Sequence, residues 1–198
     1  MDITVSLYEG KRICLAPIDA EKDAVVESRW THDAEYLRML DSEPARPVSV
    51  AMLKKRYEAI EKKMDENKTM VYFTIRLKPS EGSAEERLIG FAKLYWIEWT
   101  NGNALLSLGI GDRQDRGCGY GTEALHLILR YAFRELNLFR LSATVPSYNE
   151  PAIRLLKKNG FVEEVRRRQA VYRDGQRWDL VHFGLLSEEW QRPVDSEQ

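Results

Sequence analysis

The chain has 198 residues, and its 30 Lys and Arg against 31 Asp and Glu leave a formal net charge of -1. This length suits one domain, residues 1–198, and the balanced charge lacks the basic excess of nucleic-acid-binding proteins. No apolar run reaches the roughly 18 residues of a membrane span, and the two cysteines are too few for a disulfide scaffold. We therefore expect a globular cytoplasmic protein with no nucleic-acid or membrane partner.

The first part of the chain combines a short strand with helical segments. Ile13 to Pro17 alternates apolar positions and stops at a proline, as a strand does. From Ala20 to Leu40 the composition is helical, and Pro44 and Pro47 then interrupt it. Apolar residues recur at helical spacing from Ser49 to about Asn67, which predicts another helix with one buried face.

Alternating apolar and polar residues predict strands in the middle of the chain. Val71 to Leu77 and Leu88 to Trp96 are expected to form a hairpin across the polar loop Lys78 to Glu86. Ala104 to Ile110 has the spacing of a further strand. Apolar residues at helical intervals then predict an amphipathic helix that begins in glycines and reaches Leu136.

The last part alternates strands with one helix. Phe139 to Val145 has strand spacing, Asn149 to Asn159 is bounded like a helix, and Phe161 to Tyr172 forms a hairpin with Trp178 to Leu185. This order of elements predicts a mixed α/β or α+β layer structure. Its strand-helix-strand unit at 104–145 is expected to be a right-handed parallel crossover.

The sharpest local signal is the glycine turn, Arg116-Gly117-Cys118-Gly119-Tyr120-Gly121, between the strand that ends at Ile110 and the following helix. A helix start presents unpaired backbone N–H groups, and glycines let an anion approach them without meeting Cβ atoms. The turn therefore favours a bound phosphate. The alternative is a glycine-rich turn that holds no ligand.

Several other chemistries are disfavoured at this turn. No Lys-Ser or Lys-Thr pair follows the last glycine, which excludes a P-loop, and the spacing is not that of a dinucleotide-binding fingerprint. Cys118 is an unconvincing nucleophile because His126, the nearest histidine in the sequence, lies about 12 Å further along the helix. His32 and His182 have no neighbouring ligands at metal spacing, so we expect no metal site.

The motifs resemble those of a known family. Arg116-x-x-Gly119-x-Gly121 is similar to the R/Q-x-x-G-x-G/A signature of the GNAT acyltransferases. Asn149-x-x-Ala152 and Lys158-x-Gly160-Phe161 follow in the order and spacing of the branch similar to ribosomal-protein N-terminal acetyltransferases. The resemblance spans about residues 11–186. It implies a central mixed sheet of about six to seven strands flanked by helices.

The resemblance also implies acetyl-CoA as co-substrate, with no metal. Backbone N–H groups of the glycine turn would bind its pyrophosphate, and the strand before the turn would pair through its backbone with the pantetheine arm. Asn149 would contact the pantetheine, although its place before Glu150-Pro151 suits a helix cap equally well. The residues expected at the cofactor are Leu108, Ile110, Arg116, Gly117, Cys118, Gly119, Gly121, Thr122 and Asn149.

Two clusters of aromatic and acidic residues are candidates for the acceptor site. Trp30 and Tyr36 gather around Glu35 in the region that forms the acceptor wall in the resembled family, and Trp96 lies beside Glu98 at the end of a hairpin strand. We expect the acceptor to enter between these two regions, with Glu35 and Glu98 as candidate bases. The alternative is an aromatic core with solvated charges.

Two departures from the family pattern bear on the acceptor. Leu156 occupies the helical position where many relatives carry a tyrosine acid, and Leu105 the strand position where relatives often have a glutamate. At pH 7 a lysine-type amine costs about 4.6 kcal/mol to present neutral, whereas an α-amine costs only about 1 to 1.4 kcal/mol. With both usual groups absent, the expected acceptor is a peptide or protein N-terminus, or another weakly basic amine, rather than a polyamine or a lysine side chain.

The predicted function is acetyl transfer from acetyl-CoA to a primary amine by direct attack, with the acyl oxygen polarised by a backbone N–H near Leu108 to Ile110. The alternative is a non-catalytic module that binds acyl-CoA as a sensor or recruits a partner. The sequence leaves the oligomeric state open, a homodimer included.

Overall fold

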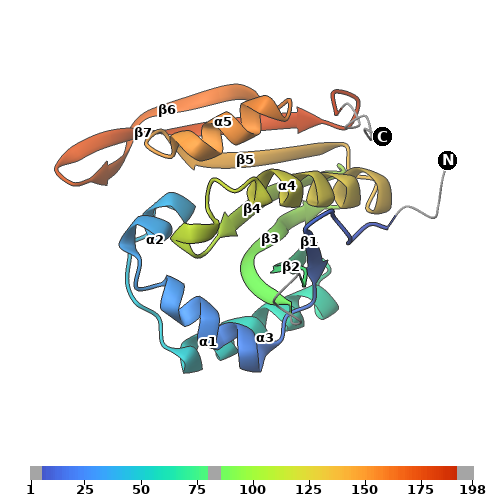
Figure 1. The fold of residues 1–198 in the computed structure, drawn as a ribbon. Coiled ribbons are helices and arrows are strands. Elements are labelled where there is room, and N and C mark those ends of the chain that lie inside the picture. Colours follow the sequence, from blue (N-terminus) through green and yellow to red (C-terminus); the bar gives the residue numbers. More distant parts are fainter. Residues whose placement is uncertain (1–5, 80–85, 191–198) are drawn as a thin grey trace.

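A seven-stranded mixed sheet organises the chain (Figure 1). The computed structural model describes residues 6–79 and 86–190. The strands lie in the order β1-β2-β3-β4-β5-β7-β6, and β4 and β5 are the parallel neighbours among antiparallel pairs. Their bounds are β1 Ile13–Ala16, β2 Met70–Leu77, β3 Arg87–Glu98, β4 Asn103–Ile110, β5 Arg140–Pro146, β6 Val162–Arg173 and β7 Gln176–Leu186. The predicted mixed sheet and parallel pairing are confirmed.

Helices cover both faces of this sheet. They are α1 Ala20–Trp30, α2 Ala34–Leu40, α3 Val50–Glu66, α4 Tyr120–Arg130 and α5 Glu150–Lys158. A short 3-10 turn, Arg113–Asp115, precedes α4, and a π-helical turn, Tyr131–Glu135, continues it. On β3, Phe91 packs in a cluster with α1 and α3, whereas its neighbour Ala92 belongs to the main core under α4 and α5. Successive strand residues point to opposite faces, so the two helical layers are separated by the sheet.

The helix expected from Ala20 to Leu40 is divided into two. α1 ends at Trp30, and Asp33 begins α2 by accepting hydrogen bonds from the N–H groups of Glu35 at 3.0 Å and Tyr36 at 3.3 Å. The prediction of one continuous helical stretch is wrong, because α1 ends at its C-cap Thr31 and Asp33 starts a new helix, with no glycine or proline between them. Because the helix breaks here, α2 takes its own direction and contacts both β4 and β5.

The remaining elements lie within a few residues of their predicted bounds. β2 and β3 pair as an antiparallel hairpin, as expected, and most of the loop between them, residues 80–85, lies outside the described part of the chain. β6 and β7 form the expected final hairpin. No helix among the described residues combines the length and apolar character needed to cross a membrane.

Candidate functional site

The parallel strands β4 and β5 separate partway along their length. Their ladder runs from Asn103 and Arg140 to Leu105 and Ser142, and no later pair joins them in the described part of the chain. β4 nevertheless continues to Ile110 and β5 to Pro146. The sheet therefore has an opening between the carboxyl ends of its two parallel strands.

The alternation of β4 determines which of its backbone groups face this opening. The N–H of Gly111 donates to Ile89 O at 2.9 Å, so Gly111 points towards β3. Because hydrogen-bonded and non-bonded pairs alternate in an antiparallel ladder, Leu108 and Ile110 direct their backbone groups away from β3. The carbonyl of Ile110 accepts from Arg116 Nε at 3.3 Å. The backbone edge at Leu108 and the N–H of Ile110 are thus turned towards the opening.

The glycine turn lies just beyond β4 and has a backbone that favours glycine. Gly117 has φ +77° and Gly119 has φ +88°, the left-handed region that residues with a Cβ rarely adopt. Gly119 is the N-cap of α4, and no described side chain caps this helix. A Cβ at Gly117 would meet no described heavy atom within 4 Å. The first-turn N–H groups, which include those of Gly121 and Thr122, therefore offer an open site for an anion.

Arg12 and Glu123 hold this turn in place, and sequence reasoning missed both. Arg12 Nη1 donates to Cys118 O at 3.0 Å, and its guanidinium lies 4.7 Å from the centre of the Tyr120 ring. Glu123 Oε1 accepts from the N–H of Arg12 at 2.7 Å and from that of Ile13 at 3.3 Å. These contacts fasten β1 to the start of α4. The contacts join residues more than 100 positions apart in the sequence, so no local sequence pattern predicts these contacts.

An open pocket of about 660 Å³ adjoins the glycine turn. Its lining residues are Lys11, Arg12, Gly119, Thr122, Glu123 and His126. His126 Nε2 lies 2.7 Å from Asn159 Oδ1, and Cys118 is exposed with its Sγ 3.4 Å from Gln114 O. Among the residues that the structure describes, no cluster of three or more ligands suits a metal ion.

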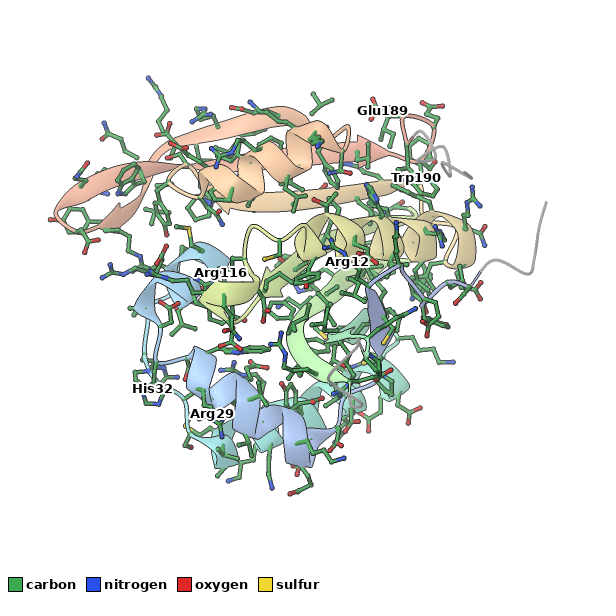
Figure 2. All side chains as sticks on the ribbon, viewed as in Figure 1. Arg12, Arg29, His32, Arg116, Glu189 and Trp190 are labelled. Carbon is green, nitrogen blue, oxygen red and sulfur yellow. The ribbon has the colours of Figure 1, made fainter. Side chains whose placement is uncertain are left out.

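Arg116 faces away from the glycine turn, towards α2. Its Nη2 donates to Asp33 Oδ2 at 2.9 Å and to the carbonyl of Gly111, and its guanidinium lies 5.4 Å from the centre of the Tyr36 ring. Figure 2 shows Arg116 beside the end of β4 and Arg12 beside α4. The guanidinium group of Arg116 therefore joins the end of β4 to α2. The guanidinium group that contacts the backbone of the glycine turn is that of Arg12.

A second cavity lies between α2, the segment after β5 and the β6–β7 turn, and measures about 260 Å³. We name it the acceptor-side cavity because Glu35, a residue expected near the acceptor, lines it. Its lining residues are Glu35, Arg38, Met39, Tyr148, Arg173, Asp174 and Trp178. Tyr148 donates from its hydroxyl to Arg38 O at 2.7 Å and packs edge-on against Trp178. Since Tyr148 follows β5 and α2 contacts both β4 and β5, the cavity lies at the end of the sheet where the two strands separate.

Trp30 and Tyr36 lie together, as expected, but both are buried. Their side chains are 3% and 4% exposed and pack edge-on, and a Cβ at Gly111 would lie 2.0 Å from the Trp30 ring. Burial raises the pKa of the Tyr36 phenol, whose oxygen has no partner among the described residues. The Trp30 ring packs against the backbone just after the end of β4. Neither side chain lines the acceptor-side cavity.

Trp96 and Glu98 lie at the opposite end of β4. Glu98 pairs with Asn103 at the start of that strand, whereas Glu35 forms an ion pair with Arg113 just after its end. The rise of β4 separates these positions by about 23 Å. The two clusters expected to flank the acceptor therefore do not lie together, because β3 places Trp96 and Glu98 away from the opening. Trp96 is 75% exposed.

The segment after β5 is fastened by Asn149. Its Oδ1 accepts from the N–H of Ala152 at 3.1 Å, which caps α5, and its Nδ2 donates to Met39 O at 2.8 Å. The predicted helix cap is confirmed. Further along α5, Leu156 is 5% exposed and belongs to the core, so the position offers packing and no proton donor.

Replacing Asn149 with alanine is expected to destabilise the protein by about 1 to 2 kcal/mol, because the first turn of α5 loses its cap and Met39 O loses a donor. Asn149→Ser keeps a capping oxygen and should recover most of the helix contribution. Urea unfolding of the three proteins measures the differences. An alanine variant as stable as the wild type would contradict the capping role.

Comparisons with known proteins agree with this arrangement. The family model described as acetyltransferase (GNAT) domain matches residues 12–162. The uncharacterized SPbeta prophage-derived N-acetyltransferase YokL of Bacillus subtilis is 26% identical over 96% of this chain and 98% of its own. The human alpha/beta-tubulin-N-acetyltransferase 9 is 26% identical over 97% of this chain and 96% of its own.

Solved structures show the same fold. The spermidine N-acetyltransferase of Vibrio cholerae, in complex with CoA and spermine, superposes with a TM-score of 0.75 at 21% identity and covers 90% of this chain and 97% of its own. A structure described as a probable acetyltransferase has a TM-score of 0.78 at 21% identity over 94% and 98% of the two chains. With a family model that spans most of the chain, this protein belongs to the GNAT acetyltransferases, which transfer an acetyl group to an amine.

Proposed function

We propose that this protein transfers the acetyl group of acetyl-CoA to the α-amine of a peptide or protein N-terminus. The observation that supports the proposal most is the position of the free β4 edge at Leu108 and Ile110. β4 leads into the glycine turn, and α2, which lines the acceptor-side cavity, contacts both β4 and β5. A donor held on one side and an amine held on the other would meet at the opening between β4 and β5.

The glycine turn fits the pyrophosphate of the coenzyme. The N–H groups of Gly117, Gly119, Gly121 and Thr122 would bind its oxygens, and the open space at Gly117 leaves room for them. Arg12 adds a positive charge beside the turn. The pantetheine arm would run along the backbone edge of Leu108 and Ile110, as an added strand does.

The bound coenzyme would supply an activated acetyl thioester at the opening. The chain's part is to hold the acyl oxygen against a β4 N–H and to direct a neutral amine at the carbonyl carbon. The new C–N bond then replaces the C–S bond, the amine gives up one proton, and the sulfur leaves as the thiol. These residues thus contribute by placing the amine beside the thioester and by polarising its carbonyl group.

Glu35 is the candidate base that remains in position. It lines the acceptor-side cavity, although its carboxylate is paired with Arg113. Glu98 is not proposed, because it lies at the far end of β4. With leucine at positions 105 and 156, the low cost of presenting a neutral α-amine favours an N-terminal acceptor over a polyamine or a lysine side chain.

A competition experiment at pH 7 tests this choice of acceptor. A lysine-free peptide with a free N-terminus, spermidine and an N-blocked lysine peptide are offered together with acetyl-CoA. We expect the free N-terminus to be acetylated at least tenfold faster than either side-chain-type amine, read by mass spectrometry. Preferential acetylation of spermidine or of the lysine peptide would contradict the proposal and indicate an additional base.

A further inference from the structure

The acceptor-side cavity holds more positive than negative charge once its contacts are counted. Its two carboxylates already have cationic partners: Glu35 pairs with Arg113, and Asp174 accepts from Arg38 Nη1 at 2.9 Å. Arg173, which also lines the cavity, makes no ion pair with a described residue. Neither carboxylate is therefore left to receive a further cation.

Within the described part of the chain, Arg173 has only neutral hydrogen-bond partners. Its Nη2 donates to the carbonyl oxygens of Ser42, at 2.6 Å, and Glu43, and its Nε is buried with no partner among the described residues. A guanidinium forms its strongest hydrogen bonds with carboxylates, often through two nitrogens at once. The cavity wall thus carries an arginine that has no carboxylate partner among the residues the structure describes.

The size and walls of the cavity limit what can supply that partner. A volume of about 260 Å³ lies below the usual range for drug-sized ligands and suits one or two amino-acid residues. Tyr148, Trp178 and Met39 form its apolar side. A polyamine would place further positive charge beside Arg38 and Arg173, whereas a short acidic group would lie against them.

We propose that the acceptor carries a carboxylate within one or two residues of its amine, and that Arg173 binds this carboxylate. The class includes peptide N-termini with Asp or Glu at the first or second position. This inference rests on the proposed acetyl transfer to α-amines. It adds a determinant of specificity on the β6–β7 turn, away from the glycine turn and the β4 edge.

The test uses the full chain and three lysine-free peptides that differ only at the second residue, which is Asp, Asn or Arg. At low salt and pH 7 we expect kcat/KM for the Asp peptide to exceed that for the Asn peptide about tenfold, with the Arg peptide lower still.

Arg173→Gln is expected to bring the Asp and Asn peptides to within about twofold of each other. Arg168→Gln, which removes an exposed charge from the same strand outside the cavity, should preserve the tenfold ratio. Equal rates for the three peptides with the wild-type protein would overturn the inference while leaving acetyl transfer intact. Failure to acetylate any peptide would instead contradict the proposed function. If Arg173→Gln folds poorly, the comparison of the Asp and Asn peptides with the wild-type protein still tests whether the acceptor's carboxylate is preferred.

Discussion

Replacing Gly119 with valine is expected to abolish the rise in melting temperature that acetyl-CoA gives the wild-type protein. A ligand at 100 times its dissociation constant stabilises by about 2.7 kcal/mol, which corresponds to several degrees for a protein of this size. Gly119 has φ +88°, and a Cβ there would lie 3.0 Å from Arg12 Nη2, at the mouth of the first turn of α4. The valine would strain the turn and block the approach of phosphate oxygens to its N–H groups.

Gly175→Val is the matched control for this variant. Gly175 has φ +75° in the β6–β7 turn, and a Cβ there would meet no described heavy atom within 4 Å. The Gly175→Val protein should lose a similar amount of intrinsic stability, and acetyl-CoA should raise its melting temperature as much as it raises that of the wild type. A Gly119→Val protein that folds and keeps the wild-type shift would show that the coenzyme binds elsewhere.

Arg76→Met is expected to destabilise the protein by about 3 to 5 kcal/mol, equivalent to a melting temperature about 10 °C lower. Asp23, on α1, is 1% exposed and accepts from Arg76 Nη2 with both carboxylate oxygens, at 2.9 and 2.8 Å. Burial raises the pKa of Asp23 even with Arg76 beside it. Removal of the arginine would leave a buried carboxyl group without its main donor.

Arg154→Met removes a charge from an exposed pair and serves as the comparison. Arg154 and Glu150 are one helical turn apart, with side chains 68% and 74% exposed, so their pairing contributes little. Thermal unfolding followed by circular dichroism measures both variants. If Arg76→Met and Arg154→Met melt within a degree of each other, the buried pair does not fasten α1 to the sheet as described.

The local elements could be predicted because their signals are local. Alternation identified β2, β3 and β4, and glycines between a strand and an amphipathic stripe identified the start of α4. The division between α1 and α2 was missed because Asp33 acts through a capping geometry that composition does not reveal. Hydrophobic periodicity predicts where a helix or strand lies, but it does not predict the polar residues at which the element ends.

The arrangement of the site depended on long-range geometry. Glu98 and Glu35 both lie in aromatic, acidic segments, yet the direction of β4 places them at opposite ends of a strand. Arg12 reaches the glycine turn because β1 lies beside α4, and Arg173 reaches the acceptor-side cavity because β6 and β7 turn beside α2. Such contacts follow from strand order, which one sequence does not display.

Acetyl transfer from acetyl-CoA to an N-terminal amine is tested most directly by measuring both products of the reaction. The full chain is incubated at pH 7 with acetyl-CoA and a lysine-free peptide that has a free N-terminus, and free thiol and acetylated peptide are quantified. We expect equal amounts of the two products, formed at a rate proportional to the protein concentration and lost in Gly119→Val. If the protein binds acetyl-CoA but acetylates neither this peptide nor any polyamine, amino acid or lysine peptide, it is not an acetyltransferase and a non-catalytic acyl-CoA-binding module is indicated.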